Sequence, residues 1–474
     1  MIRFHHLAQC AALSAALLLG GCGGNGVSSA PYVPPCPSFP CEAPTAQKLQ
    51  TPDDMGFENR KEEFENSPEY RPQYRAFVLR DDRHKEQIKA SAAYARGATG
   101  KGEVVAVNDN YFRPDHREFD VLDENGVRIG SKAAADAQVP INALGNRHGT
   151  AISALIAANR DNADIERNMH GVAFDAMLAF NQLIFDDINN HPALRDRRPF
   201  NMDVYTEEDD RKFAAQFFNL DYARAAGAGI VNQSFGLADY IDMFPEEQVR
   251  AKFKHTAAAL EQKGVPPADK IIVVWSAGNY ATGCYIIAGQ GCVIPVNPTS
   301  PEIWAGLGVY FPELREHVLA VVAVGQNGLL EDYSNPCGSA KIFCLAAPGE
   351  NLTTADSDGR TGYINVGGGT SYSAALVSGS LALLRQYFRD ENGARQLGST
   401  ELTARLLATA NNRGRYSDSD KYGHGLLDLD AATRPHGALA TSLSTDPNAR
   451  PFNPAAFSLS GNAFGGAMRD ALGD

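Results

Sequence analysis

Four nearly continuous apolar runs in the middle of the chain predict buried parallel β-strands. They lie at residues 103–107, 229–232, 270–275 and 317–324. They lack the alternation of polar residues found in strands that face water on one side, so we expect both faces of the sheet to be covered. The intervals between the runs are long enough for crossover helices. The pattern predicts an α/β fold in which helices flank both faces of a parallel sheet.

Two further segments have the apolar spacing of buried helices. One covers 148–158 and begins at His148, and the other covers about 371–384 and begins at Ser371 after a glycine run. A third segment, 87–95, is helical in character and ends before Gly97. Two of the three predicted helices therefore begin at a side chain that is capable of chemistry.

Changes in composition predict five segments along the chain. We expect a signal peptide at 1–21, a tether rich in Pro, Gly and Ser at 22–50, a charged leader that packs onto the main domain at 51–96, the main domain at 97–434 and an irregular tail at 435–474. The tail is rich in Ser, Asn, Ala and Gly and has no periodicity. All the predicted chemistry therefore falls within the fourth segment.

The first residues predict export. Arg3 precedes an apolar run at 7–19 that is too short to span a bilayer. The run ends in Leu19-Gly20-Gly21-Cys22, which resembles the bacterial lipobox, and the resemblance implies that Cys22 is lipidated and becomes the mature N-terminus. Because Gly23 follows, we expect a lipoprotein at the outer membrane or cell surface of a Gram-negative bacterium. The alternative is a plain secretory signal with an incidental Cys.

Composition and charge narrow the classes of partner. The chain is 44% hydrophobic and 21% charged, which is ordinary for a globular protein, and its formal net charge is −13. Because nucleic-acid binding needs clustered Lys and Arg, this charge disfavours it. An acidic run at 203–210 could bind calcium, but such a run is more often a solvated surface, so we assign no cofactor. We expect polypeptide partners and a monomeric protein.

The remaining cysteines form three close pairs, Cys36/Cys41, Cys284/Cys292 and Cys337/Cys344. In an exported protein this spacing predicts three local disulfides. Free thiols or a metal site are the alternatives, and no Cys-x-x-Cys motif favours the metal.

Three residues follow one another in an order that suits nucleophilic catalysis. Asp109 ends the first apolar run, and His148 and Ser371 begin the two predicted helices. A serine hydroxyl is a weak nucleophile, so it needs a histidine as general base and a carboxylate to orient that histidine. The order Asp, His, Ser differs from the orders in chymotrypsin and in α/β-hydrolases.

At these residues the chain resembles the subtilisin-like serine proteases, over roughly 97–432. The family's histidine and nucleophile motifs occur as His148-Gly149-Thr150 and Gly369-Thr370-Ser371. Its oxyanion asparagine matches Asn279 in Ser276-Ala277-Gly278-Asn279, and its substrate-binding strand matches Ser234-Phe235-Gly236. The resemblance implies a serine endopeptidase in which Asp109, His148 and Ser371 form the triad and Asn279 donates to the oxyanion, while Ser234, Phe235, Gly236, Ser276, Ala277 and Gly278 bind substrate.

The chain departs from the family pattern beside these motifs. Asn110-Tyr111 replaces the usual Ser/Thr-Gly after Asp109, and Ala375 replaces the usual Pro. Neither departure removes a reacting atom. Residues 94–102 and 457–461 look most like the passenger proteases of autotransporters, some of which are lipoproteins. Two alternatives stay open: a surface lipoprotein that uses the scaffold only for binding, and a passenger that cleaves mainly its own chain.

Overall fold

The computed structural model describes residues 55–70, 88–123, 128–135, 148–161, 169–183 and 200–434, apart from 219, 238, 282, 283, 288–290, 296 and 391. The predicted signal peptide, Cys22, the tether and the tail from 435 lie outside these residues. Within them, none of the helices is both apolar enough and long enough to cross a membrane.

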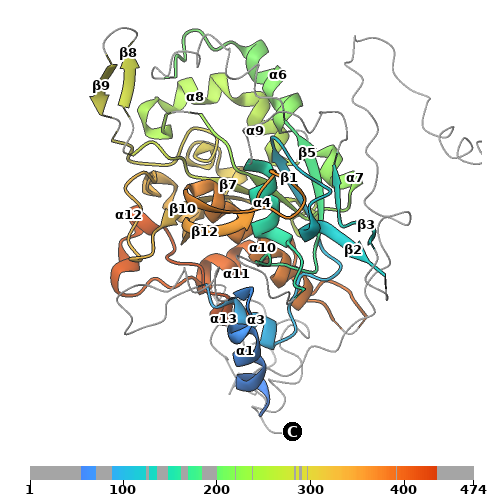
Figure 1. Ribbon diagram of the computed structural model, residues 1–474. Coiled ribbons are helices and arrows are strands. Elements are labelled where there is room, and N and C mark those ends of the chain that lie inside the picture. Colours follow the sequence, from blue (N-terminus) through green and yellow to red (C-terminus); the bar gives the residue numbers. More distant parts are fainter. Residues whose placement is uncertain are drawn as a thin grey trace, which may run out of the picture. The chain divides into compact units, whose positions relative to one another are not determined.

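A parallel sheet of seven strands forms the centre of the described fold (Figure 1). Its order is β11-β10-β7-β6-β1-β5-β4, and every neighbouring pair is parallel. The strands are β1 (Val104–Asp109), β4 (Ala133–Ala135), β5 (Met177–Gln182), β6 (Ile230–Gln233), β7 (Ile272–Ser276), β10 (Val318–Val324) and β11 (Cys344–Pro348). The four predicted runs correspond to β1, β6, β7 and β10, which confirms the predicted parallel sheet.

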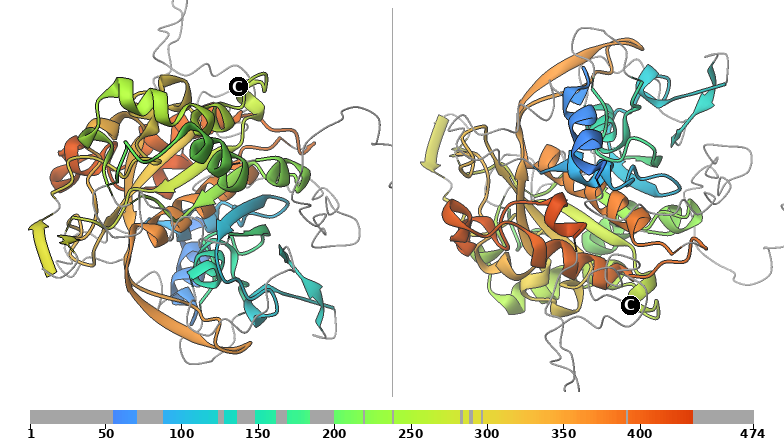
Figure 2. Two further views of the ribbon diagram at one scale, coloured as in Figure 1. Left: turned by 90° about the horizontal axis from the view of Figure 1, so that it is seen from above. Right: turned by 90° about the horizontal axis from the view of Figure 1, so that it is seen from below.

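Alternate side chains of the strands enter two different cores, one on each face of the sheet. In β1, Val105 and Val107 belong to one core, and Val104 and Ala106 belong to the other. The first core is completed by α4 (His148–Ala157), α10 (Thr370–Tyr387) and α11 (Ser399–Thr409), and the second by α6 (Glu207–Phe217), α7 (Asp221–Ala225), α8 (Glu246–Lys252) and α9 (Lys254–Glu261). Figure 2 shows the two sets of helices on opposite sides of the strands. The predicted α/β fold with helices on both faces is confirmed.

The remaining elements are short. The antiparallel hairpins are β2 (Asp120–Leu122) with β3 (Arg128–Ser131), β8 (Cys284–Ile287) with β9 (Gly291–Pro295), and β12 (Glu350–Ala355) with β13 (Tyr363–Gly368). Among the described residues, the remaining α-helices are α1 (Phe57–Asn66), α3 (Ala90–Ala95), α12 (Ser419–Tyr422) and α13 (Leu429–Ala432). The hairpin of β12 and β13 leads directly into the glycine run before Ser371.

Helix α1 packs against α3. The Nε of Arg60 donates to the carbonyl of Ala95 at 2.8 Å, and the Phe64 and Tyr94 rings lie 5.1 Å apart. The helix predicted over 87–95 begins at Ala90 in the structure. It starts there because Lys89 has a left-handed backbone with φ of 53°, which a continuous right-handed helix cannot contain.

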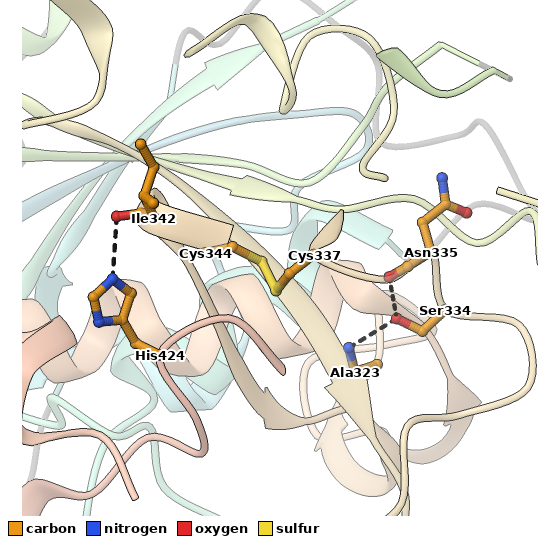
Figure 3. Close-up of a disulfide and its surroundings, with 7 residues drawn as sticks. All are labelled: Ala323, Ser334, Asn335, Cys337, Ile342, Cys344 and His424. Carbon is orange, nitrogen blue, oxygen red and sulfur yellow. Dashed lines mark hydrogen bonds between the residues drawn. A yellow bond between two sulfur atoms is a disulfide. The ribbon is translucent and has the colours of Figure 1, made fainter. Parts of the chain in front are cut away.

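One predicted disulfide is present between Cys337 and Cys344, at a Cα separation of 5.8 Å (Figure 3). It joins the segment before β11 to the first residue of that strand. Beside it, the Nε2 of His424 is hydrogen-bonded to the carbonyl of Ile342 at 3.1 Å. The pair Cys36/Cys41 lies outside the described residues, as do the side chains of Cys284 and Cys292, so those two bonds stay predictions.

Candidate active site

Asp109 and His148 meet at the carboxyl end of the sheet. Asp109 is the last residue of β1 and is buried, and His148 is the first residue of α4. The imidazole Nδ1 donates to the two carboxylate oxygens at 2.8 and 2.9 Å. This bond fixes the tautomer, because a protonated Nδ1 makes Nε2 the acceptor nitrogen of the neutral ring. The pair has the geometry of a general base with its orienting carboxylate.

The charge of Asp109 also sets the basicity of His148. Burial lowers the pKa of the imidazole, but the neighbouring carboxylate and its hydrogen bond outweigh burial and raise the pKa above the ordinary histidine value. His148 therefore holds a proton more firmly than a free imidazole would, which suits a group that must accept one.

Ser371 lies in the first turn of α10 and is buried. Its Oγ donates to the carbonyl of Ser234 at 3.1 Å, and the Oγ of Ser234 donates back to the carbonyl of Ser371 at 2.9 Å. The ring of the next residue, Tyr372, lies 6.0 Å from the ring of His148. Backbone N–H groups at a helix N-terminus stabilise negative charge, so this turn can hold a developing oxyanion.

The Asn279 amide is held in one orientation by Thr370. The Oδ1 of Asn279 accepts from the backbone N–H of Thr370 at 2.8 Å and from its hydroxyl at 2.9 Å. The same hydroxyl accepts from the N–H of Gly278 at 3.1 Å. Because Oδ1 is occupied twice, Nδ2 is the group that can donate elsewhere, and it lies 3.7 Å from the position of a Cβ built on Gly369. The Asn279 donor therefore lies beside the first residue of the motif that contains Ser371.

The predicted substrate-binding residues Ser234-Phe235-Gly236 follow the end of β6 and are linked by hydrogen bonds to α10. The Nδ2 of Asn232 donates to the Ser234 hydroxyl at 2.8 Å, and Ser378 of α10 donates to Asn232 at 2.9 Å. The indole of Trp275 donates to the carbonyl of Phe235 at 2.7 Å. Side-chain hydrogen bonds therefore fix this strand on both sides.

The backbone after Asp109 accounts for the glycine in the motif at His148, and it is strained where the chain departs from the family pattern. A Cβ on Gly149 would lie 2.3 Å from the carbonyl oxygen of Asn110, so only glycine fits there. Tyr111 has a φ of 50°, which glycine would adopt without strain. The carbonyl of Tyr111 accepts from the hydroxyl of Thr150 at 3.2 Å, so the family's threonine helps to hold the strained turn.

The acidic run at 203–210 lies on α6 and before it. Asp209 forms a capping box with Thr206, and the buried Asp210 accepts from the Thr256 hydroxyl at 2.6 Å. Carboxylates at a helix N-terminus are favoured by the helix dipole. Among the described residues, no three His, Cys, Asp or Glu side chains are arranged to hold a metal ion.

From the sequence we assigned no role to two residues that hold parts of the site in place. Thr370 orients Asn279, and its place inside the motif Gly369-Thr370-Ser371 could have pointed to it. The buried carboxylate of Glu302 accepts from the N–H of Leu237, directly after the substrate-binding strand, at 2.8 Å. No motif marks Glu302, because its contacts depend on loops that are far apart in sequence.

Asp109, His148 and Ser371 lie at the carboxyl end of a parallel sheet that helices cover on both faces. This fold and this set of residues are those of an α/β serine hydrolase. Residues 100–425 match the model of the subtilase family, Peptidase S8. The chain therefore belongs to the subtilase family, and the predicted resemblance is confirmed.

Several curated proteins match parts of the chain. The extracellular serine protease of Serratia marcescens is 27% identical over 388 residues, which are 73% of this chain and 33% of that protein. The Neisserial autotransporter lipoprotein NalP of Neisseria meningitidis serogroup B (strain ATCC BAA-335 / MC58) is 28% identical over 228 residues, 44% of this chain and 20% of that protein. The chain spans about a third or less of the length of these curated relatives.

Solved structures of proteases are also similar. The MycP3 protease from the type VII (ESX-3) secretion system is 24% identical, with a TM-score of 0.48, over 73% of this chain and 86% of that chain.

Proposed function

We propose that this chain is a serine endopeptidase that hydrolyses polypeptides through an acyl-enzyme. Asp109, His148 and Ser371 form the triad, and Asn279 donates to the oxyanion. The observation that carries the proposal is the hydrogen bond of 2.8 Å between His148 and Asp109, in a chain of the subtilase family that has Ser371 in the first turn of α10.

The chemistry follows from the roles of these groups. The Nε2 of His148 takes the proton of the Ser371 hydroxyl as its Oγ attacks the scissile carbonyl carbon. The resulting oxyanion accepts hydrogen bonds from Asn279 Nδ2 and from the N–H of Ser371. His148 then protonates the leaving amine, and water repeats the sequence to release the acid.

Substrate binding prepares the hydroxyl for this step. In the structure the Ser371 hydroxyl donates to the Ser234 carbonyl. In the family, the strand that contains this carbonyl pairs with the backbone of an extended peptide. A peptide N–H that donates to Ser234 weakens the bond to Ser371 and frees the hydroxyl to turn toward His148. The substrates are therefore extended polypeptides, with Ser234, Phe235 and Gly236 on one side and Ser276, Ala277 and Gly278 on the other.

We also propose that the protein is exported and anchored through a lipid on Cys22. The lipobox-like sequence supports this, as does similarity to a relative named an autotransporter lipoprotein. Metabolic labelling with a palmitate analogue should mark the wild type and leave Cys22→Ala unmarked. Equal labelling of both would contradict the anchor.

Casein hydrolysis by the purified full chain tests the peptidase. We expect cleavage by the wild type and loss to background in Ser371→Ala, because the nucleophile is then absent. If folded wild type does not cleave casein, or if Ser371→Ala cleaves it equally well, the proposal is wrong, and a scaffold used only for binding becomes the better account.

A further inference from the structure

A buried carboxylate lies between the two segments to which substrate binding is assigned. Glu302 is fully buried. One of its oxygens accepts from the N–H of Leu237 at 2.8 Å and from that of Trp304 at 3.1 Å, and the other accepts from the N–H of Ala305 at 2.7 Å. Its own N–H donates to the carbonyl of Ala277 at 2.8 Å. Glu302 therefore bonds to the strand after β6, to the turn after β7 and to its own loop.

The contacts of two glycines show how closely the segments approach Glu302. A Cβ on Gly236 would lie 2.5 Å from the Cδ of Glu302, and the three atoms nearest to that Cβ all belong to Glu302. A Cβ on Gly278 would lie 3.2 Å from the Cβ of Glu302. The glutamate side chain thus fills the space between the backbone at Gly236 and the backbone before Asn279.

Burying the carboxyl group of Glu302 costs free energy. Burial raises the pKa of Glu302 to about 8, and the three backbone N–H donors lower it only in part. Buried carboxyl groups without a cation are rare because they lose hydration, and the hydrogen bonds that they receive must replace it. A buried carboxyl group that costs folding free energy and is hydrogen-bonded to the backbone beside the substrate-binding segment suits a role in positioning that segment.

We propose that Glu302 is a positioning residue that supports the proposed substrate-binding segment at Ser234–Gly236 where this segment passes the turn at Ala277–Asn279. This inference rests on the proposed peptidase function. Glu302 touches no reacting atom, because it is buried beneath Gly236. It acts through Leu237, whose N–H fixes the end of the strand, and through Gly236, whose backbone rests on the carboxylate.

The test compares two substrates in Glu302→Gln. Glutamine places an NH2 group where one of the accepting oxygens lies, and that group faces an N–H donor. We expect KM for an extended peptide to rise roughly tenfold, because part of the strand's support is lost. We expect kcat/KM for p-nitrophenyl acetate to stay within about twofold, since this small ester needs the nucleophile and oxyanion donors and has no peptide backbone to pair with the strand.

Asp210→Asn is the matched control. Asp210 is also fully buried, and it accepts from the N–H of His255 and the hydroxyl of Thr256, both at 2.6 Å, in the packing of α6 on α9. Its loss should lower stability and leave the KM for the peptide unchanged. If Glu302→Gln does not fold, Glu302→Asp, which retains the carboxyl group on a shorter side chain, is measured against the same criteria.

An unchanged KM in the Glu302 variant would overturn the inference. Equal losses with the peptide and the ester would also overturn it, because they would indicate general damage to the site. A rise in KM that Asp210→Asn shares would do the same. Wild type that hydrolyses neither substrate would overturn the peptidase proposal and this inference with it, whereas active wild type with an unaffected Glu302 variant would overturn the inference alone.

Discussion

At the scale of single residues, the orientation of the Asn279 amide depends on a neighbouring hydroxyl. The backbone N–H and the hydroxyl of Thr370 both donate to Oδ1 of Asn279. These two bonds hold the amide in one rotamer, with Nδ2 pointing away from Thr370. A donor that is already oriented costs no reorganisation when charge develops. The motif Gly369-Thr370-Ser371 therefore supplies both the proposed nucleophile and the group that orients Asn279, the proposed oxyanion donor.

We predict that Asn279→Ala lowers kcat for peptide hydrolysis roughly 10²–10³-fold with little change in KM, because one donor is lost only where negative charge develops. Thr370→Val should lower kcat in the same direction but less, and Thr370→Ser should stay close to the wild type because it retains the hydroxyl. Steady-state kinetics with one peptide measures all three. A change in KM alone would contradict the oxyanion role.

The pH profile is a second prediction at this scale. The charge of Asp109 raises the pKa of His148 above the ordinary histidine value. A general base must be unprotonated, so activity falls as the pH drops through that pKa. We expect the acid limb of kcat/KM to have its midpoint above about 6.5, the pKa of a free histidine side chain. A midpoint below that value would contradict the assignment of His148 and Asp109.

At the scale of elements, the sequence predicted four strands that contain a buried apolar run. β1, β6, β7 and β10 are covered on both faces, which leaves a continuous apolar run in the sequence. From the sequence we did not predict β5 (Met177–Gln182) and β11 (Cys344–Pro348), of which β11 is short and ends in proline. Their places depend on long-range pairing with β1 and β10, which no local pattern records.

The same limit applies to the candidate site. Asp109, His148, Asn279 and Ser371 each belong to a short motif, and the structure brings Asp109 into contact with His148. Their roles stay predictions until they are tested. Glu302 has no motif, because a buried carboxylate is recognised only by the backbone groups that surround it.

The disulfide at β11 gives a prediction for one element. Cys337 and Cys344 close a short loop, with a sequence separation of 7, so their bond should stabilise the fold by about 2–3 kcal/mol through loss of chain entropy in the unfolded state. We expect the double variant Cys337→Ala/Cys344→Ala to lose this amount in urea unfolding. The single variant Cys337→Ala also lacks the bond and should lose nearly as much. An unchanged unfolding midpoint in both would contradict a stabilising role.

At the scale of the whole described fold, buried ion pairs connect the start of β1 to the end of α10, at the end of the sheet opposite to the site. Glu103 comes directly before β1 and accepts from Arg385 at 3.0 Å and from Arg389 at 2.9 Å, near the end of α10. The other ends of these two elements carry Asp109 and Ser371. The pair therefore fixes the relative position of the elements that carry two of the proposed triad residues.

We predict that Glu103→Gln lowers the free energy of unfolding by about 3–5 kcal/mol, because it leaves a buried arginine without its charge partner. The control is Glu246→Gln, which breaks an exposed ion pair with Arg250 on α8 and should change stability only marginally. Chemical denaturation of both variants measures the difference. Similar, small effects in the two would contradict the structural importance of the buried pair.

The central claim is that Ser371 is a nucleophile activated by His148, and a fluorophosphonate probe tests it most directly. The purified full chain is treated with the probe, digested and mapped by mass spectrometry, beside Ser371→Ala and His148→Ala. We expect one labelled residue, Ser371, in the wild type, no label in Ser371→Ala and strongly slowed labelling in His148→Ala. Folded wild type that stays unlabelled at Ser371, or that is labelled equally fast without His148, would contradict the account.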